Sequence, residues 1–133
     1  MKILLLVPLL LLTGCSAGAE DSLATDAGPA STLSVEVDRG DGTPAETWTL
    51  DCSAPGEGSH PEADAACAAL QEQDDPFAPL PADMACTEQY GGPQQARVTG
   101  TWSGSPVDLT VLRRNGCEIS QWESLVPLVP AAS

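Results

Sequence analysis

Cysteine is the residue that most constrains how this 133-residue chain can fold. Cys15 follows an apolar N-terminal run. Four more cysteines lie in the body of the chain: Cys52, Cys67, Cys86 and Cys117. An even number in a small exported domain predicts two disulfides, for which three pairings exist. Zinc binding is the alternative, but no two of the four have Cys-x-x-Cys spacing and His60 is the only histidine. We therefore expect two disulfides, no metal and no cofactor.

The N-terminus has the features of an export signal. Residues 1 and 2 give a short basic start, and residues 3–12 are almost wholly apolar. This run is too short for a transmembrane helix, which needs about 20 residues, and it is typical of a signal-peptide core. The following Leu12-Thr13-Gly14-Cys15 resembles the lipobox of bacterial lipoproteins. That resemblance implies cleavage before Cys15, so residues 1–14 are predicted to be a lipoprotein signal peptide.

The same resemblance implies that the thiol of Cys15 receives a diacylglycerol. Two acyl chains anchor a protein stably to a membrane, whereas a single chain is marginal. We therefore expect the protein at the extracellular face of the bacterial cell membrane, in contact with the membrane only through this lipid. The alternative is an ordinary secretory signal cleaved near Ala17 or Ala19, which predicts a secreted protein.

Acidic residues dominate the charge of the chain. It has 19 Asp and Glu against 5 Lys and Arg, and a net charge of −14. Such a surface repels the phosphates of nucleic acids, so we expect no nucleic-acid partner. Residues 15–30 are small and polar with scattered Gly and acids, which predicts a flexible tether. The folded domain is then expected to occupy residues 31–133.

The pattern of apolar residues predicts an antiparallel α+β domain. Alternation of apolar and polar residues predicts strands near residues 33–37, 47–52, 96–102 and 107–111, and an apolar run predicts a fifth strand at 125–129. An Ala- and Leu-rich stretch predicts the main helix at residues 62–73, with a short second helix at 118–124. Residues 84–93, here called the exposed loop, are polar and end in Gly and Pro. With few large apolar residues, such a domain gains much of its stability from disulfides.

Four segments together resemble the Streptomyces subtilisin inhibitor family of secreted serine protease inhibitors. Residues 60–70 resemble its His-Pro…Ala-Cys-Ala-x-Leu helix, and residues 86–90 resemble its Cys-x-x-x-Tyr reactive segment. Residues 102–104 and 115–118 resemble its later Trp-x-Gly strand and its Asn-x-Cys-Glu. The match covers about residues 33 to 129 and runs in one order, with one extra residue near Gly91-Gly92.

The resemblance implies the disulfide pairing, the mechanism and the site. It implies the bonds Cys52–Cys67 and Cys86–Cys117, and a homodimer that packs sheet on sheet. An inhibitor of this kind offers an extended, rigid loop to a serine endopeptidase as if it were a substrate. Laid on the motif, the residues are Glu88 before the scissile bond (P1), Gln89 after it, and Thr87 and Tyr90 on either side. The family's Asn maps onto Asn115, whose amide is expected to hydrogen-bond across the back of the loop.

Glu88 departs from the family's habit, in which Met, Leu, Lys or Arg is common at P1. A carboxylate that enters an apolar pocket loses its hydration and gains no hydrogen-bond partner there, at a free-energy cost on the order of several kcal/mol. A trypsin-like pocket would oppose Glu88 with another carboxylate. The partner is therefore expected to be a glutamate-specific serine endopeptidase or a subtilisin-like one. Gly91-Gly92 is a second departure, and Gly is expected to loosen the loop.

Two other classes of function are weighed against inhibition. The first is a non-inhibitory cell-surface lipoprotein that uses the same fold to bind another partner, an alternative favoured by Glu88 at P1 and by the Gly91-Gly92 pair. The second is an enzyme. A catalytic triad needs a His that lies between an acid and a nucleophile. No Ser follows a nucleophile-turn pattern, and His60 is expected to have a capping or surface role. The sequence therefore predicts that the protein is not an enzyme.

Overall fold

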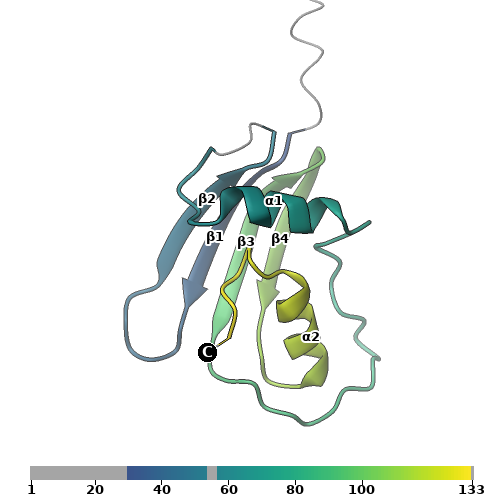
Figure 1. Cartoon of the computed structure of the whole chain (residues 1–133). Coiled ribbons are helices and arrows are strands. Elements are labelled where there is room, and N and C mark those ends of the chain that lie inside the picture. Colours follow the sequence, from purple (N-terminus) through teal and green to yellow (C-terminus); the bar gives the residue numbers. More distant parts are fainter. Residues whose placement is uncertain (1–29, 54–56, 133) are drawn as a thin grey trace, which may run out of the picture.

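The computed structural model describes residues 30–53 and 57–132, which form one antiparallel sheet with two helices on one of its faces (Figure 1). The strands are β1 (Thr32–Asp38), β2 (Glu46–Asp51), β3 (Gln95–Trp102) and β4 (Ser105–Val111). Their order in the sheet is β2-β1-β3-β4, with every neighbouring pair antiparallel. The helices are α1 (Ala63–Gln71) and α2 (Gly116–Ser124). The predicted signal peptide, the predicted lipidation site Cys15 and nearly all of the predicted tether lie outside the described residues.

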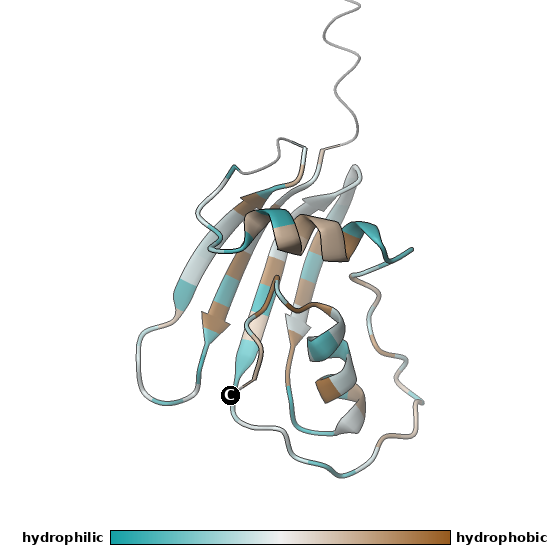
Figure 2. Ribbon diagram, viewed as in Figure 1, coloured by the Kyte–Doolittle hydropathy of each residue, from teal (hydrophilic) through white to brown (hydrophobic). Residues whose placement is uncertain are grey.

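The sheet forms because its strands alternate between core and solvent, as the sequence predicts. Leu33, Val35 and Val37 of β1 are buried, and β3 places Gly100, Val98 and Ala96 opposite them. Figure 2 shows hydrophobic and hydrophilic residues alternating along the strands under the helices. This period of two residues gives the sheet one apolar face, which the helices cover, and one polar face.

The two helices complete the core, and both have 9 residues. α1 buries Ala66, Cys67 and Leu70 against the sheet. The predicted short second helix is longer at its start than expected, because α2 begins at Gly116, and it buries Trp122 completely. In the part of the chain described here, no helix is long and apolar enough to cross a membrane.

The predicted fifth strand at residues 125–129 is wrong, so the sheet has four strands and not five. The segment continues from α2 as a series of turns, with the N–H groups of Leu125 and Val126 bonded to the carbonyls of Trp122 and Glu123. An apolar run indicates burial but does not by itself distinguish a strand from a buried turn. Leu125, Leu128 and Val129 are indeed buried, and Pro127 has no N–H to donate to a strand partner.

His60 is buried and not on the surface, which corrects part of its predicted role. Only 6% of the residue is exposed. Its Nδ1 accepts a hydrogen bond from the backbone N–H of Glu62 (3.0 Å), so Nε2 carries the proton and donates to the carbonyl of Leu128 (2.8 Å). The ring also meets Trp48 edge to face, with centroids 5.3 Å apart. His60 thus joins the start of α1 to the C-terminal turns.

Candidate functional site

The exposed loop lies between the proline-rich segment and β3, and its tip touches little of the domain. All residues from 81 to 90 are exposed, and Tyr90 retains 66% of its accessible surface. The side chains of Glu88 and Gln89 make no hydrogen bond or ion pair with any residue that the structure describes. They are therefore available to a partner without any rearrangement of the domain.

Both sides of this tip are attached to one short stretch of chain, residues 113–117, here called the support segment. On the N-terminal side, the Cys86–Cys117 disulfide joins the loop to α2 (Cα–Cα 5.3 Å), and the N–H of Gly116 donates to the carbonyl of Thr87 (3.0 Å). On the C-terminal side, the N–H of Gly91 donates to the carbonyl of Arg113 (2.7 Å). Within the exposed loop, residues 88–90 therefore lie between the two attachments and are not themselves attached.

Glycine at two positions allows this close approach. A Cβ on Gly116 would clash with the hydroxyl of Thr87, and a Cβ on Gly91 would lie 2.7 Å from Cγ1 of Ile119 in α2. We expected Gly91 to loosen the loop, but its N–H and its carbonyl are both hydrogen-bonded to Arg113. Gly91 therefore lets the loop pack closely on α2.

Arg113 connects the C-terminal attachment of the exposed loop to the core. Its residue exposure is 6%, its Nε donates to the carbonyl of Gly91 (3.0 Å), and its guanidinium lies 5.6 Å from the ring centroid of Trp122. A cation over an aromatic ring is stabilised most when both are desolvated. Trp122 is itself fixed by a hydrogen bond from Nε1 to the carbonyl of Pro130 (2.8 Å). The loop is thus connected through Arg113 to the most deeply buried aromatic residue.

Asn115 supports the loop in a different way from the one predicted. Its side chain does not hydrogen-bond the loop within the described residues. Instead Oδ1 accepts from the N–H of Glu118 (3.0 Å), which makes Asn115 the N-cap of α2. Because α2 starts here, the N–H of Gly116 is directed at Thr87. The support from Asn115 is indirect.

Glu118 completes the start of α2. Its carboxylate accepts hydrogen bonds from the backbone N–H of Arg114 (2.7 Å) and from the Arg114 guanidinium (2.7 Å from Nη2), an arrangement similar to a capping box. The hydrogen bonds from the Arg114 side chain lower the pKa of Glu118 from its ordinary value, against the opposing effect of burial. The support segment therefore leads into the first turn of α2, where the side chain of Asn115 accepts from the N–H of Glu118 and the side chain of Glu118 accepts from the N–H of Arg114.

Both disulfides have the pairing that the family resemblance implied. Cys52–Cys67 joins the end of β2 to α1, and Cys86–Cys117 joins the exposed loop to α2. All four thiols are consumed, so none is free for the zinc site weighed above. No group of three or more His, Cys, Asp or Glu able to hold a metal ion occurs among residues 30–53 and 57–132.

Of the residues predicted from sequence, Cys86 and Thr87 are attached to the support segment, whereas Glu88, Gln89 and Tyr90 are exposed between the attachments. Sequence reasoning missed Arg113 and Gly116. The one available signal for Arg113 was a basic residue in a chain with few of them, directly after an apolar strand. The role of Gly116 depends on a contact with a residue far away in the sequence, so no local pattern could reveal it.

Comparison with known proteins identifies the family. A family profile described as subtilisin inhibitor-like matches residues 29–115, which contain the sheet, α1 and the exposed loop. The Streptomyces orinoci protein "Protease inhibitor SIL-V2" is 32% identical over 102 residues, which are 72% of this chain and 93% of that protein. "Subtilisin inhibitor-like protein 4" of Streptomyces lavendulae is 37% identical over 78 residues, 57% of this chain and 66% of that protein.

Further matches have narrower coverage or a weaker fit. The chain spans about half of a "Probable subtilase-type protease inhibitor" of Streptomyces avermitilis (53% of its length), with 38% identity over 77 residues. A chain in the crystal structure of Streptomyces caespitosus sermetstatin with Bacillus licheniformis subtilisin matches with a TM-score of 0.48 and 26% identity, covering 75% of this chain and 99% of that one. The prediction that the protein is not an enzyme is confirmed by its family. The chain belongs to the subtilisin inhibitor-like family of protease inhibitors.

Proposed function

We propose that this protein inhibits a serine endopeptidase by the substrate-like mechanism, with Glu88-Gln89 as the scissile bond. The observation that carries the proposal is the attachment of the loop on both sides of residues 88–90 to the same support segment. A loop already held in an extended form loses little conformational entropy when it binds. After cleavage, the two new ends stay close together, which favours resynthesis of the bond over release.

Glu88 sets the expected target. Its carboxylate is exposed and has no partner in the described part of the chain, so it can enter a pocket without first breaking an interaction. A pocket with cationic or hydroxyl donors supplies the hydrogen bonds that an ionised carboxylate requires. A glutamate-specific serine endopeptidase is therefore the proposed target, and a subtilisin-like enzyme the second choice.

An inhibition panel tests the proposal. The purified protein is incubated with a glutamate-specific endopeptidase, subtilisin and trypsin, and residual activity and cleavage at Glu88-Gln89 are measured together. We expect the strongest inhibition of the glutamate-specific enzyme, with slow cleavage. Rapid cleavage of the bond with no inhibition of any enzyme would contradict the mechanism.

A charge reversal at the tip tests the assignment of the scissile bond. The Glu88→Lys variant should move inhibition toward trypsin, while a Tyr90→Lys variant, which places the same charge two residues further on, should not. If Glu88→Lys leaves the order of potencies unchanged, the scissile bond lies elsewhere.

We also propose that Cys15 carries a lipid that holds the inhibitor at the extracellular face of the cell membrane. The lipobox-like residues 12–15 support this location, and secretion without a lipid is the alternative. The parent chain should be found in the membrane fraction and should incorporate a labelled fatty acid. A Cys15→Ser variant should take up no label and should appear in the medium. Parent protein found in the medium without label would favour secretion.

A homodimer is part of the proposal because the family resemblance implies one that packs sheet on sheet. The polar face of the sheet, opposite the helices, is not covered by any described element. Ser34, Glu36, Thr47, Arg97 and Thr99 share it. Light scattering on the purified protein distinguishes a dimer from a monomer, and an Arg97→Glu change on this face should weaken a dimer.

One observation favours a second function, a non-inhibitory surface protein that binds another partner. Glu88 is not a residue that the family commonly uses at P1. Capture of partners from a cell-surface extract separates the two functions, because a serine protease should dominate only if the protein is an inhibitor.

A further inference from the structure

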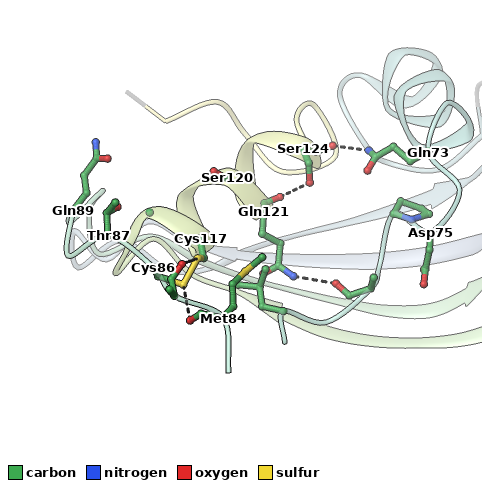
Figure 3. A pocket seen from close by; sticks show the side chains of 15 residues that line it. Gln73, Asp75, Met84, Cys86, Thr87, Gln89, Cys117, Ser120, Gln121 and Ser124 are labelled. Atoms are coloured by element: carbon green, nitrogen blue, oxygen red, sulfur yellow. Dashed lines mark hydrogen bonds between the residues drawn. A yellow bond between two sulfur atoms is a disulfide. The ribbon is translucent and has the colours of Figure 1, made fainter. Parts of the chain in front are cut away.

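A groove of about 600 Å³ begins at the exposed loop and extends away from it along α2. Figure 3 shows Thr87 and Gln89 at one end and Gln73 and Asp75 at the other, with Met84 and Gln121 between them. Thr87 and Gln89 line the groove and also flank or form the proposed scissile bond. A protease bound at the loop would therefore cover the near end of the groove.

The lining of the groove combines apolar surface with a single charge. Leu80, Met84 and Pro76 supply apolar contacts, and Asp75 is the only charged residue of the lining. Two side-chain amides of the lining are already engaged, because Gln121 of α2 donates to the carbonyl of Ala78 (3.2 Å) and Gln73, which follows α1, donates to that of Ser124 (2.7 Å). The exposed carboxylate of Asp75 has no such bond within the described residues.

The segment that forms one side of the groove carries only negative charge. Residues 72–96 contain no Lys or Arg and five exposed acids: Glu72, Asp74, Asp75, Asp83 and Glu88. The arginines of the described residues already have partners, including Arg114, which lines a neighbouring cavity together with Leu80 and Gln121. The pairs are Arg39–Glu46, Arg97–Asp108 and Arg114–Glu118, and Arg113 is buried against Gly91. The described part of this chain therefore supplies no cation to Asp75.

We propose that the groove receives an arginine or lysine side chain from the rim of the protease bound at the exposed loop. A long cationic side chain has an aliphatic stem, which suits the apolar lining at Leu80 and Pro76, and a charged end, which suits the carboxylate of Asp75. Electrostatic complementarity of this kind adds specificity and speeds association. This inference rests on the proposed function and adds a second contact, away from Glu88, by which the inhibitor selects its target.

Paired neutral variants test the groove. Asp75→Asn removes its charge, and Asp83→Asn removes the same charge from an exposed residue outside the lining. Against the enzyme inhibited in the panel, Asp75→Asn should raise the inhibition constant by about fivefold, and Asp83→Asn by less than about twofold. The difference should shrink at high salt, because screening weakens exposed ion pairs. Equal effects of the two variants would overturn the proposal.

A binding measurement without protease separates the groove from the inhibitory function. Agmatine, an aliphatic guanidinium, is titrated into the parent protein and Asp75→Asn, and the NMR signals of the Met84 methyl and the Gln121 amide are followed. Saturable shifts in the parent that Asp75→Asn abolishes support the groove, and shifts that are absent or equal in both overturn it. If no protease is inhibited, the proposed function fails, and this titration still decides whether the groove binds the cation.

Discussion

The two disulfides have different roles, because one lies in the core and the other holds the exposed loop. Cys52–Cys67 joins a strand end to the buried face of α1, and Cys67 is only 8% exposed. Cys86–Cys117 joins an exposed loop to the first turn of α2, where hydrogen bonds of Gly116 with Thr87 and of Arg113 with Gly91 add to it. The first connects parts that the core already holds together. The second holds a segment that has little core of its own, so its removal should affect function most.

The largest expected effect comes from removing the loop disulfide. In the chain-entropy account, a closed loop of 31 residues contributes about 3.5 kcal/mol to stability. The Cys86→Ser, Cys117→Ser double variant should also turn the protein from an inhibitor into a substrate, because the free end of the cut loop is no longer held. Cleavage kinetics, measured at a temperature where circular dichroism shows the variant folded, check this. Undiminished inhibition would mean that the hydrogen bonds alone fix the loop.

Removing the other disulfide should separate stability from inhibition. With a closed loop of 15 residues, the Cys52→Ser, Cys67→Ser variant should lose about 3 kcal/mol in the free energy of unfolding. Its inhibition constant should stay close to that of the parent wherever the variant is folded, since no contact of the exposed loop is removed. Urea unfolding and the inhibition assay provide both values. A parallel loss of inhibition would show that the two regions are coupled.

A methyl group at Gly91 should disturb the loop at moderate cost. Gly91→Ala places Cβ against Ile119 and Arg113, and overpacking of this kind costs about 2 kcal/mol. Inhibition should fall and cleavage should accelerate, because the C-terminal attachment is displaced. Gly42→Ala is the matched control: its φ of +87° strains an alanine, but a Cβ there would meet no atom within 4 Å. The control should lose stability without losing inhibition.

Lowering the pH should destabilise the start of α2, and this is the smallest of the effects predicted here. Hydrogen bonds from Arg114 lower the pKa of Glu118 in the folded state, so its stabilising contribution is complete above the ordinary value of 4.5 and disappears as the pH falls through the lowered value. Glu118→Gln should therefore unfold with less dependence on pH below about 4.5 than the parent. Thermal unfolding across this range measures the difference. Identical pH profiles would contradict a role for the Glu118 carboxylate.

Much of the fold could be predicted from the sequence, because the alternation in β1, β2, β3 and β4 reports burial directly. The same signal misled at residues 125–129, where burial is achieved by turns. Local patterns also missed how deeply His60 is buried, since the carbonyl of Leu128 comes from the other end of the domain. The loop could be placed from its motif. Its attachments to Arg113 and Gly116 depend on contacts between distant segments, which no single stretch of sequence encodes.

Residues 88–90 contribute almost nothing to the stability of the domain, because their side chains are exposed and the attachments lie on either side of them. Substitutions at these positions should therefore be nearly free of folding cost. If these residues contact the target, as we propose, the choice of target can change through substitutions that leave the support segment as it is. In the proposed mechanism, Glu88 at the tip is a change of specificity that the fold tolerates, and the same tolerance would make this domain a suitable scaffold for selecting inhibitors of other proteases.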